Sequence, residues 1–237
     1  MISIIVPTYN EKDNVKPLAD LIGHAIGTIT EYEILYVDDS TDETPEVLAE
    51  LSEQDSHVRY IHREGEKGLA AAVLLGFDEA NGDILTVIDA DLQHPPELLA
   101  RMYEEIEKGA DIVLPSRYIA DGEKEGLNFI RSFVSISAKK VAQALLPPIK
   151  KISDPLGGYF MFRKSVVKGI ELDPIGWKIL LEILTLGTYE RVVEIPYKFQ
   201  KRNAGESKLN FKVSMDYFRH VLLLRKRRKQ KIRGFDN

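Results

Sequence analysis

The 237-residue chain contains no cysteine. Disulfide bonds, thiolate zinc sites and cysteine nucleophiles are therefore excluded, and the composition is compatible with a reducing environment. The five histidines show no H-E-x-x-H or similar metal-binding spacing. No apolar run approaches the ~18 residues that a membrane-spanning helix requires. The apolar run from Ile2 to Pro7 has no charged segment before it and no cleavage site after it, which favours a buried strand over a signal peptide.

An excess of positive charge is confined to the C-terminal end. The formal net charge is −5, yet seven cationic residues fall within the last thirteen positions. They are Arg225, Lys226, Arg227, Arg228, Lys229, Lys231 and Arg233. This separation disfavours a nucleic-acid-binding surface over the whole domain and indicates a local basic patch.

An apolar stripe leads into this basic patch. It consists of Phe211, Met215, Phe218, Val221, Leu222 and Leu224. Such a stripe followed by cations is typical of helices at a membrane surface, so we expect residues 209–237 to form an amphipathic, basic interfacial helix. A solvated helix end is the alternative. The pattern is also compatible with a longer natural protein in which transmembrane helices follow this segment.

Strand-like and helix-like patterns alternate along the first half of the chain. The expected strands cover 2–7, 32–37, 58–61, 84–88 and 112–114, and the expected helices cover 14–27, 45–54, 69–80 and 96–108. This alternation predicts an α/β fold with a mostly parallel, Rossmann-like sheet flanked by helices, in one large domain. From residue 117 the pattern is less regular, with a helix expected at 127–146. We therefore expect a nucleotide-binding half over 1–116 and an acceptor half over 117–208.

Two carboxylates one residue apart end the apolar run at 84–88. Asp89 and Asp91 thus stand at the C-terminal end of an expected strand, where open α/β sheets bind ligands. Hard oxygen ligands in such a crevice can hold Mg²⁺ or Mn²⁺ against the phosphates of a nucleotide. The Asp-x-Asp spacing also arises by chance in solvated turns, so the metal interpretation depends on the neighbouring loops.

Polar loops follow four of the expected strands. They are Pro7 to Glu11, Asp38 to Ser40, Asp89 to Asp91, and Ser116 with Arg117. Because parallel strands open onto the same edge of a sheet, we expect these loops to share one crevice. Each loop alone could be ordinary turn chemistry, since Asn, Asp, Ser and Pro favour strand-to-helix turns. Tyr9 could pack on a nucleotide base or only cap the sheet edge, and Asp39 could accept hydrogen bonds from the base.

Several motifs resemble a known family. Pro7 to Glu11, Val37 to Thr44, Gly65 to Leu69 and Asp89 to Pro96 together resemble the inverting nucleotide-sugar glycosyltransferases of GT-A fold. A second set is similar to segments of the dolichyl-phosphate mannose synthases, especially their archaeal form. This set comprises Ser116 to Tyr118, Arg131 with Ser132, Ser153 to Pro155, and Gly176 to Glu182. The resemblance runs from residue 2 to about 208 and implies a catalytic domain over 1–208.

The resemblance implies transfer of mannose from GDP-mannose to dolichyl or another polyprenyl phosphate, with inversion and with Mg²⁺ or Mn²⁺. By position, it places the donor nucleotide sugar at Pro7, Tyr9, Glu11, Val37, Asp39, Asp89, Ala90, Asp91, Arg202 and Lys208. It places the metal at Asp89, Asp91 and Gln93, and the acceptor phosphate at Arg117, Arg131 and Ser135. The implied catalytic residues are Asp89, Asp91, Arg117 and Arg131.

The chemistry of this reaction explains why no catalytic base is assigned. A lipid phosphate is already an anion at neutral pH, so its attack on the sugar need not begin with removal of a hydroxyl proton. Glu182 is therefore not interpreted as a base, and we expect Trp177 to pack against the second half of the sheet. The remaining demands are stabilisation of the leaving diphosphate and alignment of two anionic reactants.

Other functions remain open at this stage. A polyprenyl-phosphate glucosyltransferase that uses UDP-glucose would share the fold, the metal site and the acceptor site. A non-catalytic, membrane-associated nucleotide-binding scaffold would depend on the basic helix alone, although the set of motifs disfavours it. For the transferase, the expected partners are GDP-mannose, a polyprenyl phosphate and a membrane surface, without nucleic acid. The expected location is the cytoplasmic face of the cell membrane.

Overall fold

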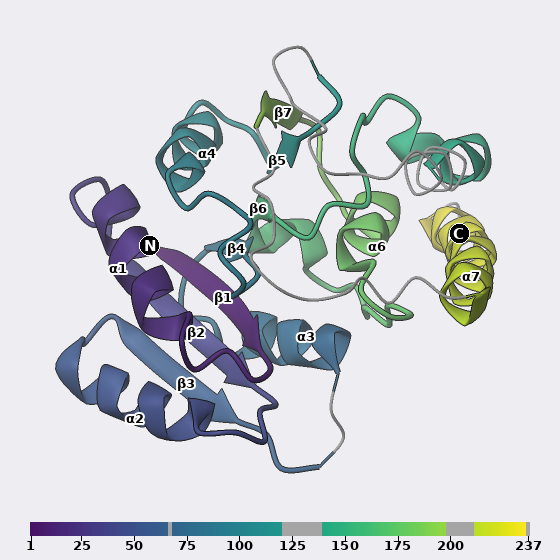
Figure 1. Ribbon diagram of the computed structural model, residues 1–237. Helices are drawn as coiled ribbons and strands as arrows, with labels where there is room; N and C mark the ends of the chain where they lie inside the picture. Colours follow the sequence, from purple (N-terminus) through teal and green to yellow (C-terminus); the bar gives the residue numbers. More distant parts are fainter. Residues whose placement is uncertain (66–67, 120–138, 198–210, 236–237) are drawn as a thin grey trace.

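The computed structural model describes residues 1–65, 68–119, 139–197 and 211–235. Within these residues, seven strands form one sheet in the order β3-β2-β1-β4-β6-β5-β7 (Figure 1). Strand β6 runs antiparallel to β4 and β5, and every other neighbouring pair is parallel. The predicted mostly parallel α/β sheet is therefore confirmed.

The strands are short and largely buried. They are β1 (Ile2–Thr8), β2 (Tyr32–Asp38), β3 (Val58–His62), β4 (Ile84–Val87), β5 (Ile112–Ser116), β6 (Phe160–Arg163) and β7 (Val192–Pro196). The first five lie within two residues of the ranges expected from the sequence. Strands β6 and β7, which were not predicted, complete the sheet in the second half of the chain.

The helices follow the strands in the alternating order expected. They are α1 (Val15–Ile26), α2 (Thr44–Gln54), α3 (Leu69–Glu79), α4 (Leu98–Glu107), α6 (Ile179–Leu186) and α7 (Phe211–Phe235), with 3₁₀ turns η1 (Pro147–Ile149) and η2 (Lys164–Val167). Residues 139–145 are helical, in agreement with the end of the helix expected at 127–146. Residues 127–138 lie outside the described part of the chain.

Alternating side chains bury the two faces of the sheet in separate clusters. Ile4 and Val6 of β1 pack with the apolar faces of α1, α2 and α4. Ile5 of β1 and Val37 of β2 point to the other face and pack with α3 and α6. This period-two alternation within helix-covered strands is expected when helices cover both faces of a sheet.

Helix α7 packs on α6, at the side of the molecule away from β1 to β3 (Figure 1). Val221 and Leu224 are fully buried against the α6 side of the core. Met215, Phe218 and Leu222 are exposed instead, as an amphipathic helix requires. None of the described helices is long and apolar enough to cross a membrane.

Candidate active site

The ends of β1, β2 and β4 open onto one cavity of about 600 Å³. Its wall consists of Pro7, Thr8, Tyr9, Glu11, Asp39, Gly68, Leu69, Ala72, Asp89, Ala90 and Asp91. Parallel register explains this convergence, because Thr8 pairs with Asp38 while Ile5 pairs with Val87. The structure thus brings together three of the four polar loops that the sequence predicted to share a crevice.

Hydrogen bonds between loops hold the β1 end against the β2 end. Asn10 adopts a left-handed backbone with φ of 58°, which Asn tolerates better than most residues. Its backbone N–H donates to Ser40 Oγ at 2.8 Å, and its side-chain oxygen accepts the N–H of Thr41 at 2.9 Å. Asp38 is fully buried beneath them and accepts from Ser40, while His62 Nδ1 lies 2.7 Å from its other oxygen. These contacts fix the loops that carry Tyr9 and Asp39.

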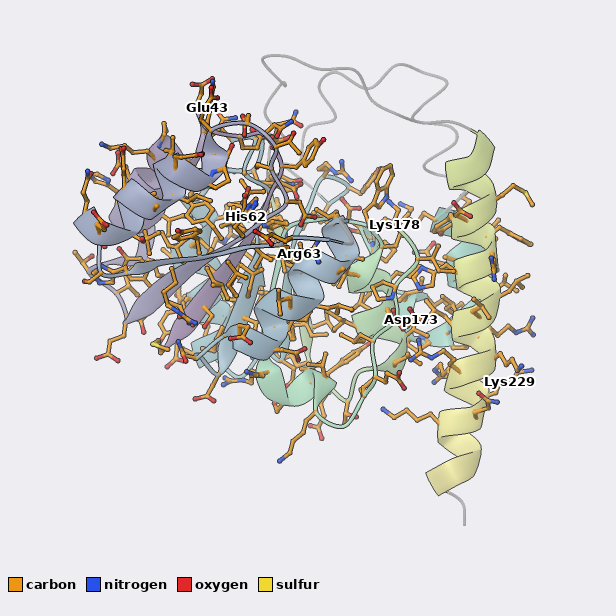
Figure 2. The ribbon with its side chains drawn as sticks, turned by 90° about the horizontal axis from the view of Figure 1, so that it is seen from below. Glu43, His62, Arg63, Asp173, Lys178 and Lys229 are labelled. Atoms are coloured by element: carbon orange, nitrogen blue, oxygen red, sulfur yellow. The ribbon has the colours of Figure 1, made fainter. Side chains whose placement is uncertain are left out.

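An arginine that sequence reasoning did not identify orients Asp39. Arg63 follows β3 and donates to Asp39 in a fork, from Nε at 2.8 Å and from Nη2 at 2.5 Å. The Gly68 N–H also donates to Asp39 at 2.8 Å, and its carbonyl accepts from Arg63. Both side chains of the ion pair are largely buried, so the carboxylate at the cavity wall is held in one orientation. Figure 2 shows Arg63 next to His62 at this edge of the sheet.

The backbone after β4 turns sharply and orients the second carboxylate. Leu92 has a φ of 59°, an uncommon left-handed conformation for a residue with a branched apolar side chain. The turn lets the Gln93 N–H donate to Asp91 Oδ1 at 3.1 Å. Strained backbone of this kind often occurs where a site demands a fixed geometry. Asp91 is therefore positioned by its own turn.

The first carboxylate contacts a buried aromatic cluster. His94 Nε2 lies 3.4 Å from Asp89 Oδ2, and His94 Nδ1 lies 3.5 Å from the hydroxyl of Tyr197. Burial raises the pKa of Tyr197 well above its ordinary value, in opposition to Arg117, so this hydroxyl remains protonated. A Cβ atom at Gly158 would lie only 3.3 Å from Asp89 Oδ2, so glycine leaves room for the carboxylate.

The described residues contain no group of three or more acidic or histidine side chains arranged as a complete metal site. Asp89 and Asp91 nevertheless both line the cavity. Mg²⁺ commonly binds to one or two carboxylates and takes its remaining ligands from water and substrate phosphates. The pair therefore fits a divalent ion that is bound together with a diphosphate.

A second cationic region lies beyond β5. Arg117 donates to Asp154 from Nε at 2.9 Å and from Nη2 at 3.3 Å. Burial opposes the charge of Arg117, but the Asp154 carboxylate outweighs it and raises the arginine pKa further above its ordinary value. Glu194 of β7 accepts the N–H groups of Ser153 and Asp154, which fixes the turn that carries this carboxylate. Arg117 is thus a permanently charged group in a fixed orientation.

The predicted site residues fall into three groups. Pro7, Tyr9, Glu11, Asp39, Asp89, Ala90 and Asp91 share the cavity. Val37 is fully buried in the core, Gln93 borders Asp91 through its backbone, and Arg117 pairs with Asp154. Arg131, Ser135, Arg202 and Lys208 lie outside the described residues. Sequence reasoning missed Arg63 and Glu194, and His94 was quoted in a motif without a role.

A mostly parallel sheet with an acidic pair and a cavity at its carboxyl edge is typical of the class of open α/β domains that bind ligands at this edge. Within this class the chain belongs to glycosyl transferase family 2, whose family model matches residues 3–170.

Related sequences cover nearly all of the chain. It is 47% identical over 226 residues to a dolichol-phosphate mannosyltransferase of Pyrococcus furiosus, with 95% of this chain and 64% of the relative covered. It is 36% identical to the dolichol-phosphate mannosyltransferase of Saccharomyces cerevisiae, with 92% and 85% covered. A polyprenol monophosphomannose synthase of Mycolicibacterium smegmatis is 33% identical, with 87% and 80% covered. The chain therefore spans less than two thirds of the Pyrococcus relative but most of the other two.

Solved structures confirm the GT-A glycosyltransferase architecture. Glucosyl-3-phosphoglycerate synthase from Mycobacterium tuberculosis, in complex with Mn²⁺, UDP and glucosyl-3-phosphoglycerate, matches with a TM-score of 0.71. The match covers 95% of this chain and 79% of that one, at 18% sequence identity. At this identity the likeness concerns the fold alone.

Proposed function

We propose that the protein transfers mannose from GDP-mannose to the phosphate of dolichol or another polyprenol, with inversion at the anomeric carbon. The observation that carries this proposal is the cavity that gathers seven of the predicted donor residues. The 47% sequence identity to a dolichol-phosphate mannosyltransferase supports the assignment of these cavity residues to a mannosyl donor. The higher identity to the Pyrococcus protein than to the yeast protein, 47% against 36%, supports the archaeal type.

The donor nucleotide would occupy the part of the cavity between β1 and β2. Tyr9 is 58% exposed and offers an aromatic face to the guanine base. Asp39, oriented by Arg63, accepts hydrogen bonds only, which suits the N–H groups on the edge of guanine. Arg202 and Lys208 are proposed, from their positions in the sequence, to neutralise the diphosphate.

Asp89 and Asp91, with Gln93, would hold Mg²⁺ or Mn²⁺. The bound metal would neutralise charge on the departing diphosphate. The protein's own contribution is to keep both carboxylates at one cavity wall, through the Leu92 turn for Asp91 and the contact with His94 for Asp89. No complete protein cage is required, because phosphate oxygens can supply further ligands.

The acceptor phosphate would bind beside Arg117, with Arg131 and Ser135 proposed as further ligands. The Asp154 pair fixes the guanidinium plane through two contacts. Arginine carries five N–H donors, more than these two contacts use, and such donors suit phosphate oxygens. Because this phosphate is anionic before it reacts, no side chain has to remove a proton. Glu182, which relatives acting on sugar hydroxyls could suggest as a base, is fully buried and engaged by Arg227.

A donor comparison tests this proposal. Purified protein should transfer mannose from GDP-mannose to a polyprenyl phosphate in the presence of Mn²⁺, and a chelator should abolish the transfer. UDP-glucose, tested in parallel with the same acceptor, should give little product. Preference for UDP-glucose would replace the proposed donor, and transfer that resists the chelator would overturn the metal assignment.

We further propose that residues 1–208 form the catalytic domain and that 209–237 form a helix at the cytoplasmic face of the cell membrane. Met215, Phe218 and Leu222 give the outer face of α7 exposed apolar area, and Arg225, Lys226 and Lys229 follow as exposed cations. Anionic headgroups attract such cations while the apolar side chains enter the interface. Arg227 and Lys231 of the basic patch have another role, because they bond to α6 and the residues that flank it.

Replacing Phe218 and Leu222 by serine should weaken binding to anionic vesicles by at least about tenfold, since two apolar side chains no longer enter the interface. Co-sedimentation with phosphatidylglycerol-containing vesicles measures the effect. The matched control replaces Leu21 and Ile29, which are also exposed but lie on the α1 side of the molecule, by serine. Equal loss in both double variants would show that α7 is not the docking face.

A further inference from the structure

Lys178 is a half-buried cation that precedes α6. Its Nζ lies 5.0 Å from the centroid of the Trp177 ring. In the described part of the chain, no hydrogen bond or ion pair engages its ammonium group. The cations at the Ser153–Asp154 turn are engaged, since Arg117 pairs with Asp154 and Lys139 donates to the Ser153 carbonyl at 3.1 Å. In Figure 2, Lys178 lies between Arg63 and α7.

The charge balance around Lys178 favours an additional anion. Burial and the nearby charge of Arg117 lower the pKa of Lys178 to about 8, while Asp154 opposes the shift. Among the residues that the structure describes, Arg117 and Asp154 are the charged groups from other segments that act on Lys178. The Asp154 carboxylate does not neutralise Lys178 fully, because it already forms a forked ion pair with Arg117. A bound phosphate beside both cations would relieve their repulsion.

Trp177 adds an apolar surface to this cationic group. It is the only tryptophan in the chain. Gly176, with a φ of 71°, makes a left-handed turn before it. We expected this side chain to pack against the sheet, but it is 42% exposed. An exposed indole next to an ammonium group matches a ligand with a charged head and an apolar chain.

We propose that Lys178 and Trp177 extend the acceptor subsite of Arg117, with the ammonium group bound to the lipid phosphate and the indole packed on its first isoprene units. This inference rests on the proposed function. In a polyprenyl phosphate, the anionic phosphate and the first apolar isoprene unit are only a few bonds apart. The subsite would then distinguish a lipid phosphate from either inorganic phosphate or a free prenyl alcohol.

The single tryptophan makes binding directly observable. Excitation of Trp177 during titration with farnesyl phosphate should give a saturable blue shift, because the indole leaves water. Farnesol and inorganic phosphate, used as separate probes, should each bind at least about tenfold more weakly, since each lacks one of the two interactions. Equal responses to farnesol and farnesyl phosphate would overturn the role of Lys178, and no response would overturn that of Trp177.

Substitutions of Lys178 then separate charge from structure. Lys178→Met should weaken farnesyl phosphate binding about tenfold and raise the acceptor KM in the same proportion, with the GDP-mannose KM unchanged. Lys150→Met, which removes an exposed lysine elsewhere, is the matched control. A Lys178→Met variant with wild-type acceptor affinity and KM would overturn the inference.

The pH profile gives a readout that a structural role would not change. For the wild type, kcat/KM for the acceptor should fall as pH rises through about 8, because the free protein then loses the Lys178 charge. Lys178→Arg should remove this fall, since arginine stays protonated. An unchanged fall in Lys178→Arg would assign the titration to another group and overturn the inference. Absence of transfer by the wild type would instead refute the proposed function.

Discussion

Replacing Asp91 by asparagine is expected to lower mannosyl transfer roughly a thousandfold while the fold stays intact, because a metal ligand that stabilises the leaving diphosphate is worth several kcal/mol. Asparagine keeps the oxygen that accepts the Gln93 N–H at 3.1 Å, so the Leu92 turn should persist. It removes the negative charge that a divalent cation requires. The loss should therefore concern metal binding and not folding.

Two measurements separate these effects. Circular dichroism and the unfolding midpoint should match the wild type, while GDP binding should be weaker than wild type only when Mn²⁺ is present. In a chelator, both proteins should bind GDP equally. The matched control is Asp83→Asn, since Asp83 is an exposed carboxylate at the opposite end of the same strand, before β4. A fully active Asp91→Asn variant would falsify the metal assignment.

The sequence was sufficient to predict the first five strands and the acidic pair. Their signals are local, since apolar runs end in Asp89 or Asp38 and the following helices have clear apolar periods. Strand β6 has only four residues, and its antiparallel insertion between β4 and β5 depends on pairing that no local pattern encodes. The same holds for β7, which pairs with β5 across a long stretch of chain.

Residues that orient the site were harder to predict than residues that line it. Arg63 acquires its role by reaching Asp39, 24 positions earlier in the sequence. Glu194 of β7 accepts hydrogen bonds from Ser153, which lies in a turn 41 positions earlier, and His94 meets Tyr197 across the sheet edge. Spacing alone carries no information about such tertiary pairs. Glu182 shows this most clearly, because the terminal basic patch gave no indication that one of its arginines pairs with a buried carboxylate.

Glu182 joins α7 to α6 through a buried polar cluster. Its side chain is fully buried, and Arg227 of α7 donates to Oε1. His220 Nε2 lies 3.7 Å from Oε2, and the Asp173 N–H donates to both oxygens at 3.2 Å. Arg227 also donates to the Glu171 carbonyl. The cluster therefore connects α7 to the segment that leads to Lys178.

Arg227→Met should lower the free energy of unfolding by about 3 kcal/mol, because it leaves a buried carboxylate without its strongest partner. The estimate is at the low end of the usual range since the Arg227 side chain is 30% exposed. Urea unfolding measures the change. Lys229→Met, on the outer face of the same helix (Figure 2), should change stability by no more than about 0.5 kcal/mol.

A double variant tests whether the loss comes from the uncompensated charge. Glu182→Met combined with Arg227→Met should recover most of the stability, since apolar side chains can replace a buried ion pair at little cost. If Arg227→Met alone were as stable as the wild type, the pair would not hold α7 in place. Loosening of α7 should also expose it to protease, and it should weaken vesicle binding even though Phe218 and Leu222 are unchanged. That combination would show that the buried pair positions the helix whose outer face is proposed to meet the membrane.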